Sequence, residues 1–230
     1  MAQAIYTRWF LQFEFPNEEG KPYKSSGGKM TYNDELKREI PNGWETKHLK
    51  ECCEIVLGGT PKTEESEYWN GNINWLNSGE IANFPIISSE LKITTLGMNE
   101  SATTFMKKGT TVVSITGNLR SSILAIDSCA NQSVVGILEN SKYRTSYIFP
   151  FIKDMISTFT KISTGNCQQH INKGTIQDAV ILVPGENILR KYYKKVENIY
   201  EFICKNALEN QKLISLRNYL LPLLINGQLQ

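Results

Sequence analysis

The sequence predicts a mixed α/β (α+β) fold, in which a mostly β domain is followed by a long, projecting helix of the coiled-coil type. Short β-branched and aromatic runs separated by Gly, Asn and Ser turns fill residues 41–184, a spacing typical of short strands. After Pro184-Gly185, Gly and Pro are absent until Pro222, and apolar residues recur at helical spacing. The chain therefore divides into residues 1–40, 41–184 and 185–230.

Residues 1–40 are predicted to be the end of a helix followed by a linker. The stretch from Ile5 to Phe13 is apolar and aromatic. It is followed by breaker-rich runs at residues 16–22 and 25–28.

Residues 41–184 are predicted to form one domain of short strands with few helices. We expect strands at residues 54–57, 73–76, 110–116, 122–126, 134–138 and 179–183, and a helix at residues 147–160. Gly58-Gly59-Thr60-Pro61-Lys62 follows the first of these strands but lacks the Walker spacing of a phosphate-binding loop. We interpret it as a turn, and close approach of its backbone to a ligand is an open alternative.

Residues 185–230 are predicted to be a helix for dimerisation or partner binding, with a short tail. A helix over residues 187–221 would be about 50 Å long, more than a domain of this size needs for its own core. An apolar stripe with polar Asn positions follows the helical spacing, which is typical of a pairing helix. Its members are Tyr192, Val196, Ile199, Ile203, Asn206, Asn210 and Leu213. Packing of the first turns on the domain itself is the competing interpretation.

Composition excludes several classes of protein. The chain has 230 residues, is 40% hydrophobic and contains no apolar run long enough for a membrane span. The opening residues do not resemble a secretory signal, so we expect a cytoplasmic protein. Five cysteines without Cys-x-x-Cys spacing and two histidines predict neither a disulfide framework nor a metal site. A net charge of +2 means that any nucleic-acid contact must come from local patches.

No catalytic constellation stands out in the sequence. Ser78 lacks the Gly-x-Ser-x-Gly setting of a nucleophile, and His48 and His170 fall in no recognisable triad order. We therefore expect no catalytic residues and no cofactor bound by this chain.

Several loops combine amides, hydroxyls and cations, the side chains that read base edges and phosphates in DNA. Lysines are expected at phosphates, and Asn, Gln and Arg at bases. The alternative for each single residue is an ordinary turn or a solvated surface position. The candidate DNA-binding residues are Lys62, Thr63, Lys108, Asn118, Arg120, Asn131, Gln132, Asn166, Gln168, Gln169, His170 and Lys173.

Trp44, Trp69 and Trp75 are predicted to be structural. Stacking on a flipped base is the functional alternative. A large aromatic side chain more often packs in the core.

An ordered series of motifs resembles the specificity subunits of type I restriction-modification systems. The series runs from Trp9-Phe10 and Ile40-Pro41-Asn42-Gly43-Trp44 through Gly58-Gly59-Thr60-Pro61, Trp75-Leu76-Asn77-Ser78-Gly79-Glu80-Ile81 and Asn131-Gln132 to Leu220-Leu221-Pro222. Residues 41–184 are similar to one target recognition domain of that family, and residues 185–230 to a conserved long helix. The family carries two of each, so the chain resembles half a subunit.

The resemblance implies a non-catalytic subunit that reads one half of a bipartite sequence in double-stranded DNA. It also implies docking to a methyltransferase subunit that uses S-adenosylmethionine and to an ATP- and Mg-dependent restriction subunit. Homodimerisation through the long helix would restore the two-domain arrangement. The alternative is a protein-interaction or regulatory module that keeps the fold without reading DNA.

Overall fold

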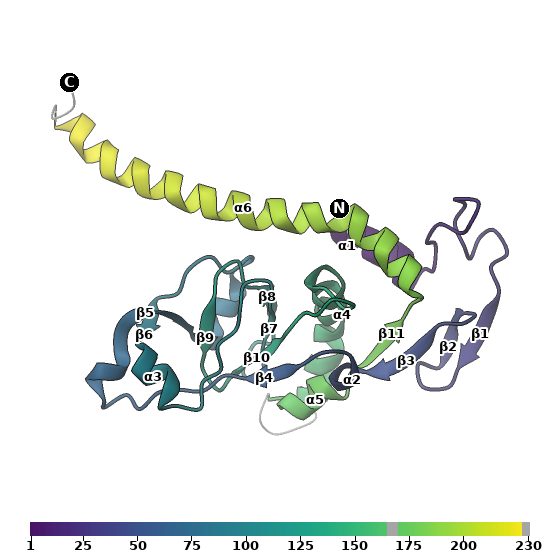
Figure 1. Cartoon of the computed structure of the whole chain (residues 1–230), viewed down its shortest axis with the longest axis horizontal. Coiled ribbons are helices and arrows are strands. Elements are labelled where there is room, and N and C mark those ends of the chain that lie inside the picture. Colours follow the sequence, from purple (N-terminus) through teal and green to yellow (C-terminus); the bar gives the residue numbers. More distant parts are fainter. Residues whose placement is uncertain (165–169, 227–230) are drawn as a thin grey trace.

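The computed structural model describes residues 1–164 and 170–226 and shows a layered α/β domain with a long helix leaving it (Figure 1). The helical elements are α1 (Ala2–Tyr6), the π-helical turn η1 (Thr7–Leu11), α2 (Leu49–Cys52), η2 (Ser66–Tyr68), η3 (Ser78–Ala82), α3 (Thr95–Asn99), α4 (Thr145–Thr164), α5 (Lys173–Gln177) and α6 (Glu186–Ile225). The strands are β1 (Met30–Asn33), β2 (Arg38–Pro41), β3 (Glu45–His48), β4 (Ile55–Leu57), β5 (Trp69–Leu76), β6 (Leu91–Ile93), β7 (Thr111–Ser114), β8 (Ser121–Ile123), β9 (Ser128–Ala130), β10 (Val134–Ile137) and β11 (Val180–Val183).

A four-stranded antiparallel sheet in the order β4-β10-β7-β8 lies at the centre of the domain. Every residue of β7 and β10 is buried. The β-branched run in each strand therefore packs on both faces, which explains why these segments were readable from sequence. A second sheet has the order β6-β5-β9, with β5 and β9 parallel. The pairs β1-β2 and β3-β11 complete the described sheets.

The predicted mixed α/β fold with a projecting helix is confirmed. The expected helix at residues 147–160 is the core of α4, and each expected strand overlaps an observed one. Sequence reasoning missed several short elements. These are β1, β2, β3, β6, β9 and the short helices α2, α3 and α5.

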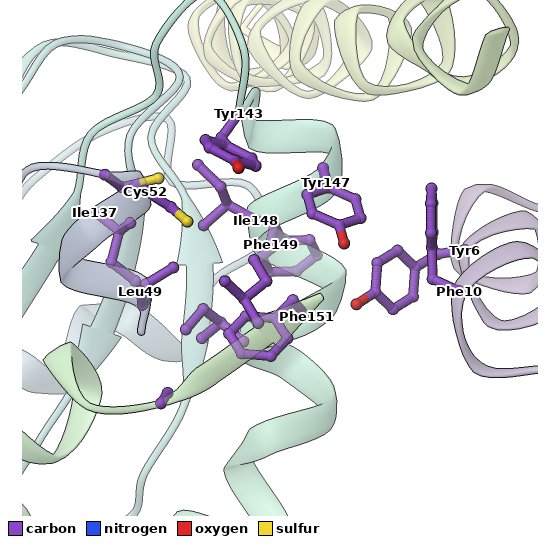
Figure 2. Close-up of a cluster of buried hydrophobic side chains, with 14 of the residues drawn as sticks. Tyr6, Phe10, Leu49, Cys52, Ile137, Tyr143, Tyr147, Ile148, Phe149 and Phe151 are labelled. Atoms are coloured by element: carbon purple, nitrogen blue, oxygen red, sulfur yellow. The ribbon is translucent and has the colours of Figure 1, made fainter. Parts of the chain in front are cut away.

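Residues 1–40 begin with the expected helical segment, α1 and η1, but the part that follows differs from the expected linker. The segment contains the β1–β2 hairpin, and its aromatic side chains are part of the main core. Phe10 is fully buried, with its ring centroid 4.8 Å from those of both Tyr147 and Tyr192. Tyr6 lies 5.7 Å from Tyr147, and Figure 2 shows Tyr6 and Phe10 facing α4. Aromatic packing therefore makes the N-terminal segment part of the domain. Its rings bury more apolar surface than the side chains of a solvated linker would.

The first half of α6 packs on the domain and the second half leaves it (Figure 1). The helix has 40 residues, so it is about 60 Å long. Its buried residues are Leu189, Tyr192, Tyr193, Val196 and Tyr200. In the described part of α6 beyond Tyr200, no residue is buried. The helix continues through Pro222, past the expected end at Leu221.

These contacts correct the predicted partner stripe. Tyr192 and Val196 are fully buried against the domain, so they have no surface left for a partner. Ile199 and Ile203 are half-buried, whereas Asn206, Asn210 and Leu213 are exposed. Packing of α6 on its own domain was the competing interpretation for the first turns near Leu189. It extends about three turns beyond Leu189, to Tyr200.

None of the helices in the described part of the chain is long and apolar enough to cross a membrane.

Candidate functional site

Four strand ends meet at one end of the central sheet. The antiparallel register places Leu57, at the end of β4, beside Val135 of β10. Val134, at the start of β10, pairs with Ser114 at the end of β7. The turn after β7 then leads directly into β8. The segments that connect these ends are consequently neighbours in space, although they are far apart in sequence.

Backbone hydrogen bonds join these segments into one surface. Gly58 N donates to Val134 O (3.0 Å), and Ile115 N donates to Ser133 O (2.9 Å). Ile171 N donates to Ile115 O (3.1 Å), and Thr116 and His170 form an isolated bridge. We call residues 58–63, 115–120, 131–133 and 170–173 the loop cluster.

The loop cluster brings together most of the described DNA-binding candidates. Its members from that set are Lys62, Thr63, Asn118, Arg120, Asn131, Gln132, His170 and Lys173. All are exposed except Asn131 and Lys173, which are half-buried. Lys173 is the first residue of α5, and α5 lies on the opposite side of the domain from α6 in Figure 1.

The turn that carries Asn118 and Arg120 is held at its base by Ser114. The buried Ser114 hydroxyl donates to Asn118 O (2.9 Å) and accepts from Arg120 N (2.9 Å). Gly117 has φ +65, a conformation that a residue with a Cβ rarely adopts. The Asn118 and Arg120 side chains are both exposed, and they extend into solvent from a backbone whose conformation is fixed.

Asn131 has the ordinary turn role that was the alternative to base reading. Its side-chain Oδ1 accepts a hydrogen bond from Ser133 N (3.0 Å), which is the Asx-turn arrangement. Asn131 therefore shapes the turn, and Gln132 beside it is the exposed amide.

Lys108, the remaining described candidate for a phosphate contact, does not belong to the loop cluster. It precedes β7, at the opposite end of the sheet, and its backbone N donates to Asp127 Oδ1 (2.7 Å). There it lines a cleft of about 820 Å³ between the domain and the middle of α6, together with Arg144, Glu197 and Lys205. The sequence gives no indication of this, because strand direction decides which end of the sheet a loop occupies.

The candidates Asn166, Gln168 and Gln169 lie outside the described residues. Thr60, in contrast, is not among the candidates that the sequence indicates, and it lies within the loop cluster. Its hydroxyl donates to Gln132 Oε1 at 2.5 Å. The two residues are 72 positions apart, so no local pattern indicates their contact.

The turn at residues 58–62 approaches its own chain closely, so its glycines need no ligand to explain them. A Cβ on Gly58 would lie 2.2 Å from Asn131 O, and one on Gly59 would lie 2.5 Å from the backbone carbon of Ala102. The indole of Trp75 donates to Gly59 O (3.0 Å), and that of Trp69 donates to Lys62 O (3.1 Å). Both tryptophans hold this turn in place.

The structural role predicted for the tryptophans agrees with their packing. Trp75 is 5% exposed. Trp69 lies against it with ring centroids 5.2 Å apart in an edge-on arrangement. Trp44 stacks on Phe15 at 5.0 Å.

The site offers hydrogen-bond donors and positive charge. Lys62, Arg120 and Lys173 carry cations, while Asn118 and Gln132 carry amides.

In the part of the chain that the structure describes, no group of His, Cys, Asp and Glu side chains is arranged to hold a metal ion. Burial raises the pKa of the Cys53 thiol to about 12 and that of Cys129 to about 11. These two thiols are therefore protonated at neutral pH and are poor nucleophiles. The chemistry that this surface favours is binding to an acceptor-rich, negatively charged ligand.

Comparison with known proteins places the chain in a family. The family model described as "Type I restriction modification DNA specificity domain" matches residues 41–218. The MjaIX specificity subunit of Methanocaldococcus jannaschii is 25% identical over 240 residues, which cover 100% of this chain and 52% of that protein. The HindI specificity subunit of Haemophilus influenzae is also 25% identical, over 83% of this chain and 42% of its own length. The chain thus spans about half the length of these relatives.

Solved structures share the fold. The HsdS subunit from Thermoanaerobacter tengcongensis superposes with a TM-score of 0.58 at 12% identity, covering 91% of this chain and 44% of that one. The S subunit of a type I system from M. genitalium gives a TM-score of 0.52 at 15% identity. The match covers 79% of this chain and 45% of that one. The family match over most of the chain, supported by these relatives and this fold, shows that the chain belongs to the type I restriction-modification DNA specificity family.

Proposed function

We propose that this chain is a sequence-specific DNA recognition subunit that reads one half of a bipartite target and has no catalytic role of its own. The observation that carries the proposal is the loop cluster, where segments from four parts of the sequence meet at one end of the central sheet. The cluster presents Asn118, Arg120, Gln132 and His170 to solvent above a fixed backbone. A DNA-reading surface needs this combination, since base edges require directed donors and acceptors.

Within this proposal, each side chain has a role that its chemistry favours. Arg120 suits the two acceptors of guanine, and Asn118 suits the donor and acceptor of adenine in the major groove. Lys62 and Lys173 suit backbone phosphates, which position the protein on DNA without specifying sequence.

We further propose that α6 docks the chain to a methyltransferase subunit and an ATP-dependent restriction subunit, and to a second copy of this chain. S-adenosylmethionine and ATP with Mg would be bound by those partners. The part of α6 beyond Tyr200 supports this part, because it exposes large apolar residues that its own domain does not cover. Examples are Phe202 at 61% and Leu213 at 56% exposure.

Residues of α6 beyond Tyr200, which are exposed or half-buried, follow two rows along the helix. An outer row has the three-and-four spacing of a pairing seam and comprises Phe202, Asn206, Glu209, Leu213, Leu216, Leu220 and Leu223. At 3.6 residues per turn it is rotated roughly 140° from the residues that pack on the domain. An inner row continues the domain-facing line and comprises Ile203, Ala207, Ile214, Leu221 and Ile225. Two separate rows suit two different partners.

We assign the outer row to the second copy, running antiparallel. A parallel, in-register pair would place the two Glu209 carboxylates opposite each other, and like charges at a seam are destabilising. Two antiparallel copies are related by a two-fold axis, so the two half-sites that they read would be inverted repeats.

Methylation mapping of the host genome, with and without this gene, tests the recognition role. We expect one bipartite motif to lose methylation when the gene is deleted and to regain it on complementation. An Arg120→Ala complement should restore less methylation, or a relaxed motif. An unchanged methylation pattern in the deletion strain would contradict DNA recognition and favour a protein-interaction or regulatory module.

A further inference from the structure

Thr60 and Gln132 form a contact that fixes the orientation of an exposed amide. The Thr60 hydroxyl lies 2.5 Å from Gln132 Oε1. This contact is shorter than a normal hydrogen bond, at the lower limit for O–H···O bonds and below that for N–H···O bonds. The oxygen of the Gln132 amide therefore faces Thr60, and its NH₂ group faces away.

The two loops that carry this pair are held independently of it. Gly59 N donates to Ala130 O (2.8 Å), and Asn131 N donates to Leu76 O (2.9 Å). The Thr103 hydroxyl also donates to Ala130 O (2.9 Å). Because these bonds leave the backbone fixed, the Thr60 hydroxyl controls only the side chain of Gln132.

The Gln132 oxygen is turned to Thr60, so the amide presents its NH₂ group on the side away from Thr60. A glutamine that pairs with adenine presents a donor and an acceptor together to the base edge; the bonded oxygen keeps a second lone pair, but it does not face the same side as the NH₂ group. What remains is an NH₂ group suited to an acceptor oxygen. We propose that Thr60 acts as a positioning residue that turns Gln132 into a donor for a DNA phosphate oxygen, a contact that is independent of base sequence.

The surroundings favour a phosphate over a base acceptor. Lys62 is an exposed cation two residues beyond Thr60 in the same loop. The neighbouring amide, Asn131, accepts from Ser133 N through its Oδ1. This corner of the loop cluster thus presents a donor and a cation, as phosphate contacts do. The inference rests on the proposed DNA recognition, since it names the ligand of one part of that surface.

The test uses the full chain and two duplexes of equal length. One is the preferred duplex that the wild-type chain selects from a pool with a randomised segment, and the other is its scrambled sequence. Dissociation constants are measured for Gln132→Ala, Thr60→Val and the matched control Thr60→Ser, which keeps the hydroxyl. We expect Gln132→Ala to weaken binding to both duplexes by the same factor, about tenfold, as for a lost hydrogen bond to a charged group. Thr60→Val should act in the same direction by a smaller factor, and Thr60→Ser should match the wild type.

The outcomes separate this inference from the proposed function. A change in base preference at one position in Gln132→Ala would overturn the phosphate assignment and make Gln132 a base reader. Wild-type affinity for Thr60→Val on both duplexes would overturn the positioning role. A wild-type chain that binds all duplexes equally, while Gln132→Ala still weakens binding, would overturn sequence recognition and support the phosphate contact. Absence of binding to any duplex would overturn both.

Discussion

Replacing Trp75 by alanine removes the side chain that links the core of the second sheet to the loop cluster. Trp75 is 5% exposed, its indole donates to Gly59 O at 3.0 Å, and its ring lies 5.2 Å from that of Trp69. The change therefore removes buried apolar surface, one hydrogen bond and one aromatic contact.

The expected loss of stability follows from these three contributions. A buried aromatic side chain removes about 150–250 Å² from water, which at about 25 cal/mol per Å² is an upper bound of about 4–6 kcal/mol. The lost hydrogen bond contributes about 1 kcal/mol. Since area estimates use an extended unfolded chain and overstate burial, we expect the free energy of unfolding to fall by about 3–5 kcal/mol.

Urea unfolding followed by far-UV circular dichroism measures this change without relying on tryptophan fluorescence. Trp69→Ala is the matched control, because Trp69 is the half-buried member of the same pair and its loss should lower the free energy of unfolding by about 1–2 kcal/mol. A loss below about 1 kcal/mol in Trp75→Ala would refute burial of this indole and reopen its role as a platform for a flipped base.

Other predictions concern the loops, the helix and the thiols. Arg120→Ala should weaken binding to the preferred duplex by about 1–3 kcal/mol in a binding titration, with the unfolding curve unchanged. Gly58→Ala should cost several kcal/mol in urea unfolding, because its Cβ would lie 2.2 Å from a backbone oxygen; a neutral result would contradict the close packing of these loops. Sedimentation should show a dimer at micromolar concentration and a monomer for Leu216→Asp, with thermal stability of the domain retained, since Leu216 is 51% exposed. A monomeric wild type would refute dimerisation. At pH 8 the raised pKa of Cys129, about 11, leaves about one thiol in a thousand ionised, so native alkylation should spare it until the chain unfolds.

Leu216→Asp is a sharper test of dimerisation than a change at Ile203. Ile203 is half-buried, so an aspartate there would also disturb the helix on its own domain. Leu216 lies well beyond Tyr200, the last buried residue of α6.

Continuous β-branched runs made the central sheet predictable. The runs at residues 111–114 and 134–137 are buried on both faces, so every position is apolar or small and the pattern is unambiguous. The β1–β2 hairpin was missed because most of its residues are exposed or half-buried and its turn depends on Asn33 Oδ1, which accepts from Leu36 N, and on Lys37 at φ 49. Neither feature follows from hydrophobic periodicity.

The candidate site was predictable in residue type but not in arrangement. Amide- and cation-rich turns marked Asn118, Arg120 and Gln132 correctly as exposed polar positions. The sequence did not show that Lys108 precedes β7 at the opposite end of the sheet, because that depends on strand pairing over long distances. The same limit applies to α6, where periodicity located the apolar residues but tertiary packing decided that Tyr192 and Val196 face the domain.

Buried strands that support exposed turns also affect how this protein tolerates mutation. The turn that carries Asn118 and Arg120 follows β7, and Gln132 precedes β10, two strands that are buried along their whole length. Substitutions at such exposed turn positions usually change stability by less than about 0.5 kcal/mol, whereas changes in the strands cost several times more. Natural variation at exposed positions such as Asn118, Arg120 and Gln132 can therefore accumulate almost without a folding penalty, whereas Gly58 in the same loop cluster is constrained by close packing while the scaffold stays the same.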